Sequence, residues 1–365
     1  MRFTIEYLVT CLQGETIQEK ALGIALEQSV ELPTSVLDAW ILANTAGKVE
    51  SIKETGEKTF LVECSYAVSI VDGDLTQFLN VLLGNISLKP GIQVINVDWE
   101  TIQDWFPGPR FGVEGVRVNM GIPNRPLSCS ALKPIGFTID KLADIAFQFA
   151  TGGIDIIKDD HGIADQRHAP FSERVKACVE AVNHAHDLTG KQTWYFPNVT
   201  TKGSKLIDRF REAEDLGAQG VLLCPQLCGL EMMADLASSD VNLPIMAHPS
   251  FSGNYLGAIN GFSHSFLYGS LWRAFGADFV IYPNNGGRFS FTLDECIGIN
   301  QAALDPMVPY ARTFPTPGGG VDRNKIPEWR AKYGNDIVFL MGASLYKHPE
   351  GIKAATIEVQ EALNQ

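Results

Sequence analysis

The sequence lacks the long apolar runs that membrane-spanning segments require. No stretch approaches the roughly 20 consecutive apolar residues of a transmembrane helix. The opening Met-Arg-Phe-Thr-Ile-Glu-Tyr is not followed by the apolar core of a secretory signal. Short-period repeats and low-complexity segments are also absent. These absences predict a globular protein that has no membrane partner.

Basic residues are scarce relative to acidic ones. Lys and Arg number 29 against 42 Asp and Glu, which gives a net charge of −13 at pH 7. A surface of this sign repels nucleic acids and anionic membranes, so neither is an expected partner. A small anionic substrate is still compatible with this charge, because a local pocket can be positive in an acidic protein.

The seven cysteines form no recognisable disulfide or zinc pattern. Their number is odd, no Cys-x-x-Cys pair occurs, and Cys224 and Cys228 have no partner pair at zinc spacing. Reduced and mostly buried thiols are therefore expected, and with them a cytoplasmic location.

Two kinds of secondary-structure pattern divide the 365 residues. Residues 1–115 mix strand-like alternation with helical periodicity, and a turn-forming cluster at 107–112 lies near their end. Residues 116–365 alternate short apolar strands with segments that are mostly helix-like. We therefore predict a smaller N-terminal α+β domain, 1–115, followed by a larger domain, 116–365.

The larger domain has the rhythm of a barrel. Eight strand–helix units over roughly 240 residues are typical of an α/β fold of the TIM (β/α)8 type. An open doubly wound sheet is the alternative, but no Gly-x-Gly-x-x-Gly follows an early strand. The predicted strands are residues 127–132, 154–158, 193–199, 220–224, 244–247, 279–282, 313–315 and 337–341.

The second of these strands ends in Lys158, Asp159, Asp160 and His161. Because strand side chains alternate between faces, Lys158 and Asp160 should point one way and Asp159 the other. Barrel active sites lie at the carboxyl ends of the strands, so this cluster is a candidate metal or acid–base site. The alternative is a helix cap with surface charge, in which Lys158 pairs with Asp160.

Asp160 and His161 are suitable ligands for a divalent metal, whereas a lysine ammonium is not. Lys158 can donate an oxygen only after CO₂ has converted its amine to a carbamate. The sequence does not show this modification.

Polar and glycine residues end other predicted strands as well. Lys133 and His248 are candidates for acid–base or charge-stabilising roles. Arg288 is either a mobile-loop cation or an ordinary surface arginine. The ends of the last two strands could present backbone N–H groups to a phosphate, as in many such barrels. The residues concerned are Gly318, Gly319, Gly320, Gly342, Ala343 and Ser344.

Together these residues resemble the large subunit of RuBisCO, and more closely the RuBisCO-like proteins. The similar motifs are Lys133-Pro134, the strand Gly-Gly-Ile-Asp-Ile-Ile-Lys-Asp-Asp, and the two glycine stretches. The resemblance spans nearly the whole chain. It implies that Lys158 is carbamylated, that Asp160 binds Mg²⁺, and that His161 replaces the third metal ligand, a glutamate.

The resemblance assigns further roles. It implies that Lys133 handles protons at an enediolate and that His248 lies near the substrate. Arg288 is about where RuBisCO has a mobile-loop lysine. A homodimer is implied, in which Glu27 reaches the neighbouring subunit's site. Asn85 stands where the related diketo-methylthiopentyl-phosphate enolases are expected to have their base lysine, which disfavours that activity.

Three departures from the RuBisCO pattern argue against carboxylation of ribulose bisphosphate. Ile135 replaces a second lysine associated with CO₂ addition, and Pro249 and Ile281 replace the cations of one phosphate site. Burying a phosphate without a cation costs several kcal/mol. A substrate with one phosphate and a neutral far end is therefore expected.

The resemblance implies a Mg²⁺-dependent isomerase that transfers a proton within 5-methylthioribulose 1-phosphate. Decarboxylation of a 3-oxo sugar-acid phosphate would use the same enediolate, and the methionine-salvage enolase reaction is a further alternative. A non-catalytic binding or regulatory protein is the alternative from another class. The joint persistence of Lys133, Lys158, Asp160 and His248 favours an enzyme.

Overall fold

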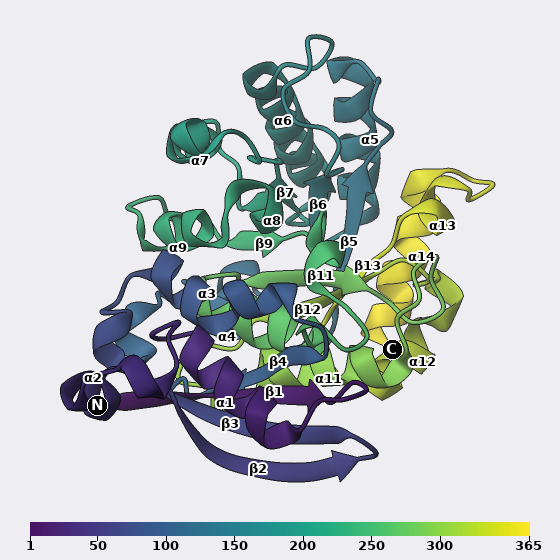
Figure 1. Ribbon diagram of the computed structural model, residues 1–365. Helices are drawn as coiled ribbons and strands as arrows, with labels where there is room; N and C mark the ends of the chain where they lie inside the picture. The colour runs from purple at the N-terminus through teal and green to yellow at the C-terminus, as the bar shows by residue number, and fades with distance from the viewer. The chain divides into compact units, whose positions relative to one another are not determined.

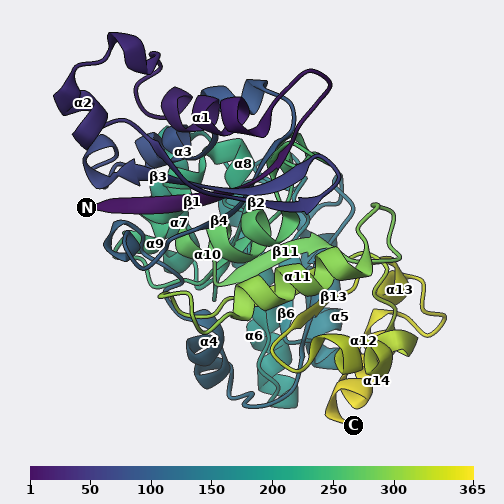
Figure 2. The same ribbon diagram turned by 60° about the horizontal axis from the view of Figure 1, so that its bottom comes forward.

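The computed structural model describes all residues, 1–365, and the chain divides into two compact units (Figures 1 and 2). The first unit contains Met1–Phe106, Ser252–Leu267 and Met307–Pro309, and the second contains the rest. The chain thus first passes from one unit to the other at Phe106, close to the turn-forming cluster at 107–112. The single boundary after residue 115 stays a prediction.

The first unit is built on a five-stranded sheet with the order β10-β4-β1-β3-β2. β1 pairs antiparallel with both β3 and β4, and alternate β1 side chains are buried, as a strand with one face on a core requires. Helix α1 contacts β2 and β3 (Figure 2). The elements are β1 (Arg2–Thr10), α1 (Ile17–Glu27), α2 (Ala39–Asn44), β2 (Lys48–Gly56), β3 (Thr59–Ala67), α3 (Leu75–Leu83), β4 (Ile92–Val97) and β10 (Gly261–Phe262).

The second unit is an eight-stranded parallel barrel, which confirms the predicted fold class. The strand order is β7-β6-β5-β13-β12-β11-β9-β8, and a bridge between Asn198 and Leu222 joins the two ends of the sheet. The strands are β5 (Leu127–Leu132), β6 (Ile156–Asp159), β7 (Trp194–Phe196), β8 (Val221–Leu223), β9 (Ile245–Ala247), β11 (Phe279–Pro283), β12 (Phe314–Gly318) and β13 (Val338–Leu340).

Helices follow most of the barrel strands, and α5 and α6 lie side by side (Figure 1). None of the helices combines the length and apolar character needed to cross a bilayer. They are α4 (Gly112–Met120), α5 (Ile139–Gly152), α6 (Phe171–Thr189), α7 (Gly203–Asp215), α8 (Pro225–Cys228), α9 (Leu230–Ser238), α10 (Trp272–Ala274), α11 (Leu293–Leu304), α12 (Ile326–Tyr333), α13 (Ala343–Tyr346) and α14 (Ile352–Asn364).

The barrel core includes a helix that was not predicted from the sequence. Val113, Val116 and Met120 of α4 are buried in the same cluster as inward-facing strand residues such as Phe279 and Phe314. Their i, i+3, i+7 spacing is a helical signal. The signal was obscured because α4 begins directly after the turn-forming cluster and contains two glycines, which weaken helix propensity.

The start of α4 is held by a buried carboxylate. Asp278 is fully buried, and its Oδ1 accepts hydrogen bonds from the backbone N–H groups of Phe111 (2.7 Å) and Gly112 (2.8 Å). Its Oδ2 accepts from Ile245 N–H at 2.9 Å. One side chain therefore satisfies two N–H groups at a helix start and one at the start of β9.

Replacing Asp278 with Asn should destabilise the barrel by about 1–3 kcal/mol, because an amide NH₂ would face one of these three buried N–H donors. The measurement is a thermal unfolding scan. Asp240→Asn is the control, since Asp240 forms an exposed ion pair with Arg211, and its effect should be within about 0.5 kcal/mol of zero. Equal unfolding temperatures for the two variants would contradict this account.

Candidate active site

Lys133 and Asp160 meet where β5 and β6 end. The two strands pair in parallel, with Ala131 opposite Lys158 and Leu132 opposite Asp159. The next residues along each strand therefore lie together, and Lys133 Nζ is 3.4 Å from Asp160 Oδ2. The sequence alternative, an ion pair between Lys158 and Asp160, is not formed; Lys133 takes that position.

Two histidines complete this cluster. The Nδ1 atom of His161 is 3.4 Å from Oδ1 of Asp160. The His161 ring stacks on the ring of His248, with centroids 4.4 Å apart and planes inclined by 18°. His248 follows β9, and its backbone N–H donates to Leu223 O of the neighbouring β8. Strands far apart in sequence thus bring together Lys133, Asp160, His161 and His248, as the barrel prediction required.

Lys158 lies deeper than the rest of the cluster. It is 2% exposed, and its Nζ donates to the carbonyl of Asp159 at 3.1 Å. Burial lowers the pKa of the Lys158 amine, and this effect outweighs the opposing charge of Asp160. A lowered pKa favours the neutral amine, which is the form that reacts with CO₂.

The carboxylate of the cluster is ionised and its histidines are neutral. Burial would raise the pKa of Asp160, yet the charge of Lys158 and the N–H of Gly162 hold it below its usual value. Burial also lowers the pKa of His161, and the positive charge of Lys158 adds to the effect. The pKa of His248 is lowered well below its usual value for the same two reasons.

The metal-donor set is incomplete without modification. Asp160 and His161 supply an oxygen and a nitrogen, and no group of three His, Cys, Asp or Glu side chains is arranged to hold a metal. The buried amine of Lys158 is the remaining group of the predicted triad. A carbamate there would supply an anionic oxygen, the kind of donor that Mg²⁺ prefers.

Asp159 faces the opposite side of β6, as strand alternation predicted. Its carboxylate accepts a hydrogen bond from Tyr195 Oη at 2.7 Å and forms a fully buried ion pair with Arg174 at 3.1 Å. Asp159 therefore lies between β6 and α6 and is not part of the cluster around Asp160. Arg174 and Tyr195 were not singled out from the sequence, because no local pattern marks them as its partners.

The glycine stretch after β12 has backbone conformations that favour glycine. Gly319 and Gly320 have φ of +82° and +70°. A Cβ on Gly320 would lie 2.7 Å from the backbone nitrogen of Gly287, so only glycine fits. After β13, the Oγ of Ser344 is buried and has no hydrogen-bond partner within the chain.

The amine of Lys133 lies near Asp160 and also near the second glycine stretch. A Cβ built on Gly342 would lie 3.7 Å from Lys133 Nζ. Arg288, in the loop after β11, is exposed and stacks on Phe289 at 4.9 Å. Its charge contributes to the lowered pKa of His161.

Glu27 and Asn85 lie in the first unit and contact each other. Asn85 Nδ2 donates to Glu27 Oε1 at 3.3 Å, and Lys89 Nζ is 2.8 Å from Glu27 Oε2. The hydrogen bond from Lys89 lowers the pKa of Glu27. The Glu27 carboxylate is therefore ionised and oriented by its own chain.

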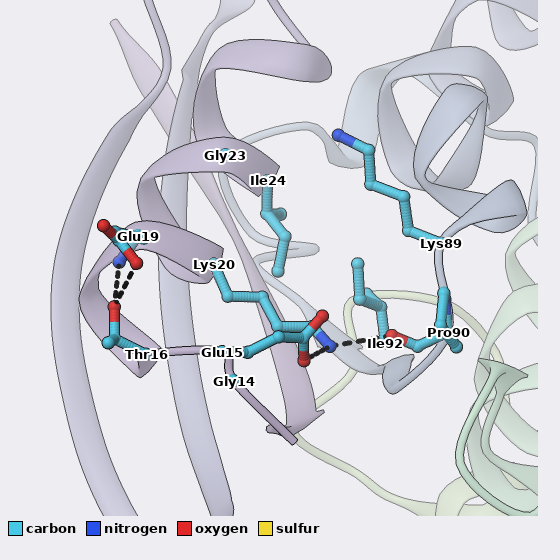
Figure 3. A pocket seen from close by; sticks show the side chains of 10 residues that line it. All are labelled: Gly14, Glu15, Thr16, Glu19, Lys20, Gly23, Ile24, Lys89, Pro90 and Ile92. Carbon is cyan, nitrogen blue, oxygen red and sulfur yellow. Dashed lines mark hydrogen bonds and ion pairs between the residues drawn. The ribbon is translucent and has the colours of Figure 1, made fainter. Parts of the chain in front are cut away.

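A hollow of about 360 Å³ in the first unit contains none of the predicted site residues (Figure 3). Its buried lysine, Lys20, donates to Glu15 Oε2 at 2.6 Å and to the carbonyls of Thr10 and Pro90. Figure 3 shows the Lys20 ammonium turned toward Glu15 and Pro90. These contacts use all three donors of the ammonium, so it stabilises the fold.

Comparisons with known proteins agree with this architecture. Residues 112–280 match the catalytic domain of the ribulose bisphosphate carboxylase large chain. The 5-methylthioribulose-1-phosphate isomerase of Rhodospirillum rubrum is 38% identical over 333 residues, 90% of this chain and 88% of the relative. The 2,3-diketo-5-methylthiopentyl-1-phosphate enolase of Geobacillus thermodenitrificans is 33% identical over 355 residues, 92% and 86% of the two chains.

A solved structure gives the same result. The Rubisco-like protein from Rhodopseudomonas palustris has a TM-score of 0.89 and 32% identity, with 100% of this chain and 97% of that chain covered. An eight-stranded parallel barrel together with a separate, smaller sheet unit is the RuBisCO fold. The chain belongs to the RuBisCO large-chain family and is a RuBisCO-like protein of type IV.

Ser250 was not identified from the sequence. It determines which ring nitrogen of His248 carries the proton. The Ser250 backbone N–H donates to His248 Nδ1 at 3.2 Å, and the Ser250 hydroxyl lies 3.0 Å from the same atom. A backbone N–H can only donate, so Nδ1 carries no proton and the neutral ring carries its proton on Nε2. His248 is then a hydrogen-bond donor through Nε2.

We predict that ¹⁵N NMR near neutral pH will show His248 as the Nε2–H tautomer, identified by the loss of its signals in His248→Gln. His186 is an internal control of the opposite kind, because its Nδ1 lies 3.1 Å from the carbonyl of Lys191, which can only accept. His186 should carry its proton on Nδ1. A proton on Nδ1 of His248 would contradict the assignment.

Proposed function

We propose that the protein isomerises 5-methylthioribulose 1-phosphate by moving a proton between carbon atoms through an enediolate. The observation that carries this proposal is the 38% identity to the isomerase of Rhodospirillum rubrum over 90% of the chain. The cluster of Lys133, Asp160, His161 and His248 is consistent with it, since enediolate chemistry needs a proton-transfer group beside groups that stabilise an oxyanion.

Lys133 is the proposed proton-transfer group. Its side chain is 40% exposed, so it is accessible at the end of β5, and Asp160 holds its ammonium from one side. As the neutral amine, Lys133 would remove a proton from the carbon beside the substrate carbonyl and become an ammonium. That ammonium would then return the proton to a different carbon. His248 would donate a hydrogen bond from Nε2 to a substrate oxygen, which stabilises negative charge as it develops.

Asp160, His161 and a carbamate on Lys158 are the proposed ligands of Mg²⁺. The residues fit this role because burial lowers the pKa of the Lys158 amine, and the neutral amine is the form that reacts with CO₂. When bound, the metal would supply positive charge beside the enediolate oxygens. His161 makes the set less anionic than three carboxylate-type ligands would be.

The phosphate is proposed to bind at the two glycine stretches. Gly319 and Gly320 would approach it through backbone N–H groups, and the buried Ser344 hydroxyl would donate to it. The remaining members of this proposed site are Gly318, Gly342, Ala343 and Arg288. Pro249 and Ile281 offer no charge for a second phosphate, so we propose that ribulose bisphosphate is not carboxylated.

Two other activities use the same enediolate. The enolase reaction is named for a relative with 33% identity, yet Asn85 stands at the position expected of its base, and here it contacts Glu27. Decarboxylation of a 3-oxo sugar-acid phosphate would need the same cluster and no further base. A non-catalytic role is disfavoured because Lys133 lies 3.4 Å from Asp160 and the ring of His248 stacks on that of His161.

We propose that the enzyme is a cytoplasmic homodimer. All seven cysteines are free thiols, which suits a reducing compartment. Around α2, Leu32, Val36 and Trp40 are 51%, 63% and 68% exposed. Exposed apolar side chains at neighbouring positions are typical of protein–protein contacts. Glu27 is proposed to reach the active site of the partner subunit.

Replacing Lys133 with Met should lower kcat by about 10²–10⁴-fold, because Met keeps the length of the side chain but transfers no proton. Binding of inorganic phosphate, measured by calorimetry, should change little. Turnover is followed by NMR with 5-methylthioribulose 1-phosphate.

Lys141→Met is the matched control for the Lys133 variant. Lys141 is an exposed lysine on α5 that pairs with Asp144, so its loss should leave kcat unchanged. Retained turnover in Lys133→Met would remove Lys133 from the mechanism. If the wild-type protein did not convert the substrate, the isomerase proposal would be wrong, and the decarboxylase reaction would be tested next.

Trp40→Glu should convert a dimer to a monomer at micromolar concentration, since a charge at an apolar interface must be desolvated. Sedimentation equilibrium measures this directly. Val118→Glu is the control, because Val118 is 78% exposed on α4, away from the α2 segment in sequence. A wild-type protein that is monomeric yet active would contradict the dimer proposal.

A further inference from the structure

A buried network lies on the opposite side of β6 from the proposed catalytic cluster. Asp159 is fully buried, and its Oδ2 accepts a hydrogen bond from the backbone N–H of Asn198 at 2.9 Å. The same oxygen accepts from Arg174 Nε at 3.2 Å, and Oδ1 accepts from Tyr195 Oη. One carboxylate thereby joins residues of β6, β7 and α6 to the segment that follows β7.

Arg174 extends this network into the loop that follows β6. Its side chain is fully buried at the first turn of α6. Its guanidinium donates to the carbonyl of Ala169 and to the carbonyl of Ala164, each at 2.7 Å. The planar guanidinium presents its donors in fixed directions, so Arg174 determines where both carbonyls lie relative to Asp159.

Asn198 holds the part of the loop nearest the cluster. Its Nδ2 donates to the carbonyl of His161 at 3.0 Å and to the carbonyl of Ile163 at 2.9 Å. Its Oδ1 accepts from the Thr200 N–H at 3.1 Å. Asn198 is 1% exposed, so water does not compete for these bonds.

The backbone that the network holds is the backbone that carries Asp160 and His161. Asp160 Oδ1 accepts a hydrogen bond from the Gly162 N–H at 3.2 Å, and the Ile163 N–H donates to the Asp160 carbonyl at 2.9 Å. The direction of the Asp160 carboxylate therefore depends on the path of residues 160–163. That path is fixed at two carbonyls by the Asn198 amide.

We propose that Asn198, together with the Asp159–Arg174 ion pair, is a positioning element that holds Asp160 and His161 in their metal-binding arrangement. The inference rests on the proposed metal site and extends it to residues that do not touch the metal or the substrate. Outer groups of this kind, when removed, typically weaken metal affinity or activity by about 10–100-fold.

Asn198 is a better test position than Asp159 or Arg174. Removing either charge would leave the other buried and uncompensated, and the protein would then be at risk of unfolding. Asn198→Ala removes both donors to the loop and leaves the backbone N–H that binds Asp159. Asn198→Leu also lacks the donors but keeps the approximate size of the side chain, so the two variants differ in the space they fill and share the loss of the loop bonds.

The chain offers a matched control just before the start of β6. Asp155, which precedes β6, is 2% exposed and accepts two hydrogen bonds from Arg125, at 2.7 and 2.8 Å, and one from Ser128 N–H. Asp155→Asn disturbs a buried network of similar size at the opposite end of β6. A loss of stability alone would therefore appear in this variant as well.

The first measurement is hydrogen–deuterium exchange of the metal-free protein. In both Asn198 variants, amides of residues 160–164 should exchange faster than in the wild type and faster than in Asp155→Asn. The second measurement is Mn²⁺ binding in bicarbonate buffer, followed by electron paramagnetic resonance. The apparent Kd should rise by about 10–100-fold in the Asn198 variants and remain near the wild-type value in Asp155→Asn.

Equal exchange and equal Mn²⁺ affinity in the Asn198 and Asp155 variants would overturn the proposal. So would a wild-type protein that binds no Mn²⁺ in bicarbonate. Neither measurement uses the substrate. A failure of the proposed isomerase activity would therefore leave these results unchanged and is distinguishable from a failure of the positioning role.

Discussion

The parallel register between β5 and β6 is the constraint on which the proposed site depends. Because Ala131 lies opposite Lys158 and Leu132 opposite Asp159, the chain must bring Lys133 beside Asp160 as both strands end. A slip of one residue would exchange the faces of the side chains. Lys158 would then leave the barrel interior, and the cluster would lose its buried amine. The carboxyl ends of the other strands are placed by the same sheet.

The proposed site contains positive charge although the protein as a whole is acidic. The whole chain has a net charge of −13, yet Lys133 Nζ lies 3.4 Å from Asp160, and the charge of Arg288 lowers the pKa of His161. The two histidines stay neutral because burial lowers the pKa of each, and the charge of Lys133 adds to the effect. For the proposed phosphorylated substrate, positive charge at the strand ends would matter more than the sign of the outer surface.

Much of the fold could be predicted from the sequence, because each barrel strand is a short apolar run and most are followed by a helical pattern. The alternation rule also placed Lys158 and Asp159 on opposite faces. What could not be predicted depends on contacts between distant segments. Strand β10 has only two residues and therefore no periodicity. The partner of Asp160 depends on strand register, and the role of Ser250 depends on the orientation of a ring.

Solvent-deuterium exchange observed by NMR tests the central claim most directly. The protein would be incubated with Mg²⁺, bicarbonate and 5-methylthioribulose 1-phosphate in D₂O. The account predicts deuterium at carbon positions of the substrate together with a new isomer. Release of CO₂ from a 3-oxo acid phosphate, without exchange, would show a decarboxylase instead. No reaction with either compound would contradict the enzymatic account and favour a binding protein on this barrel.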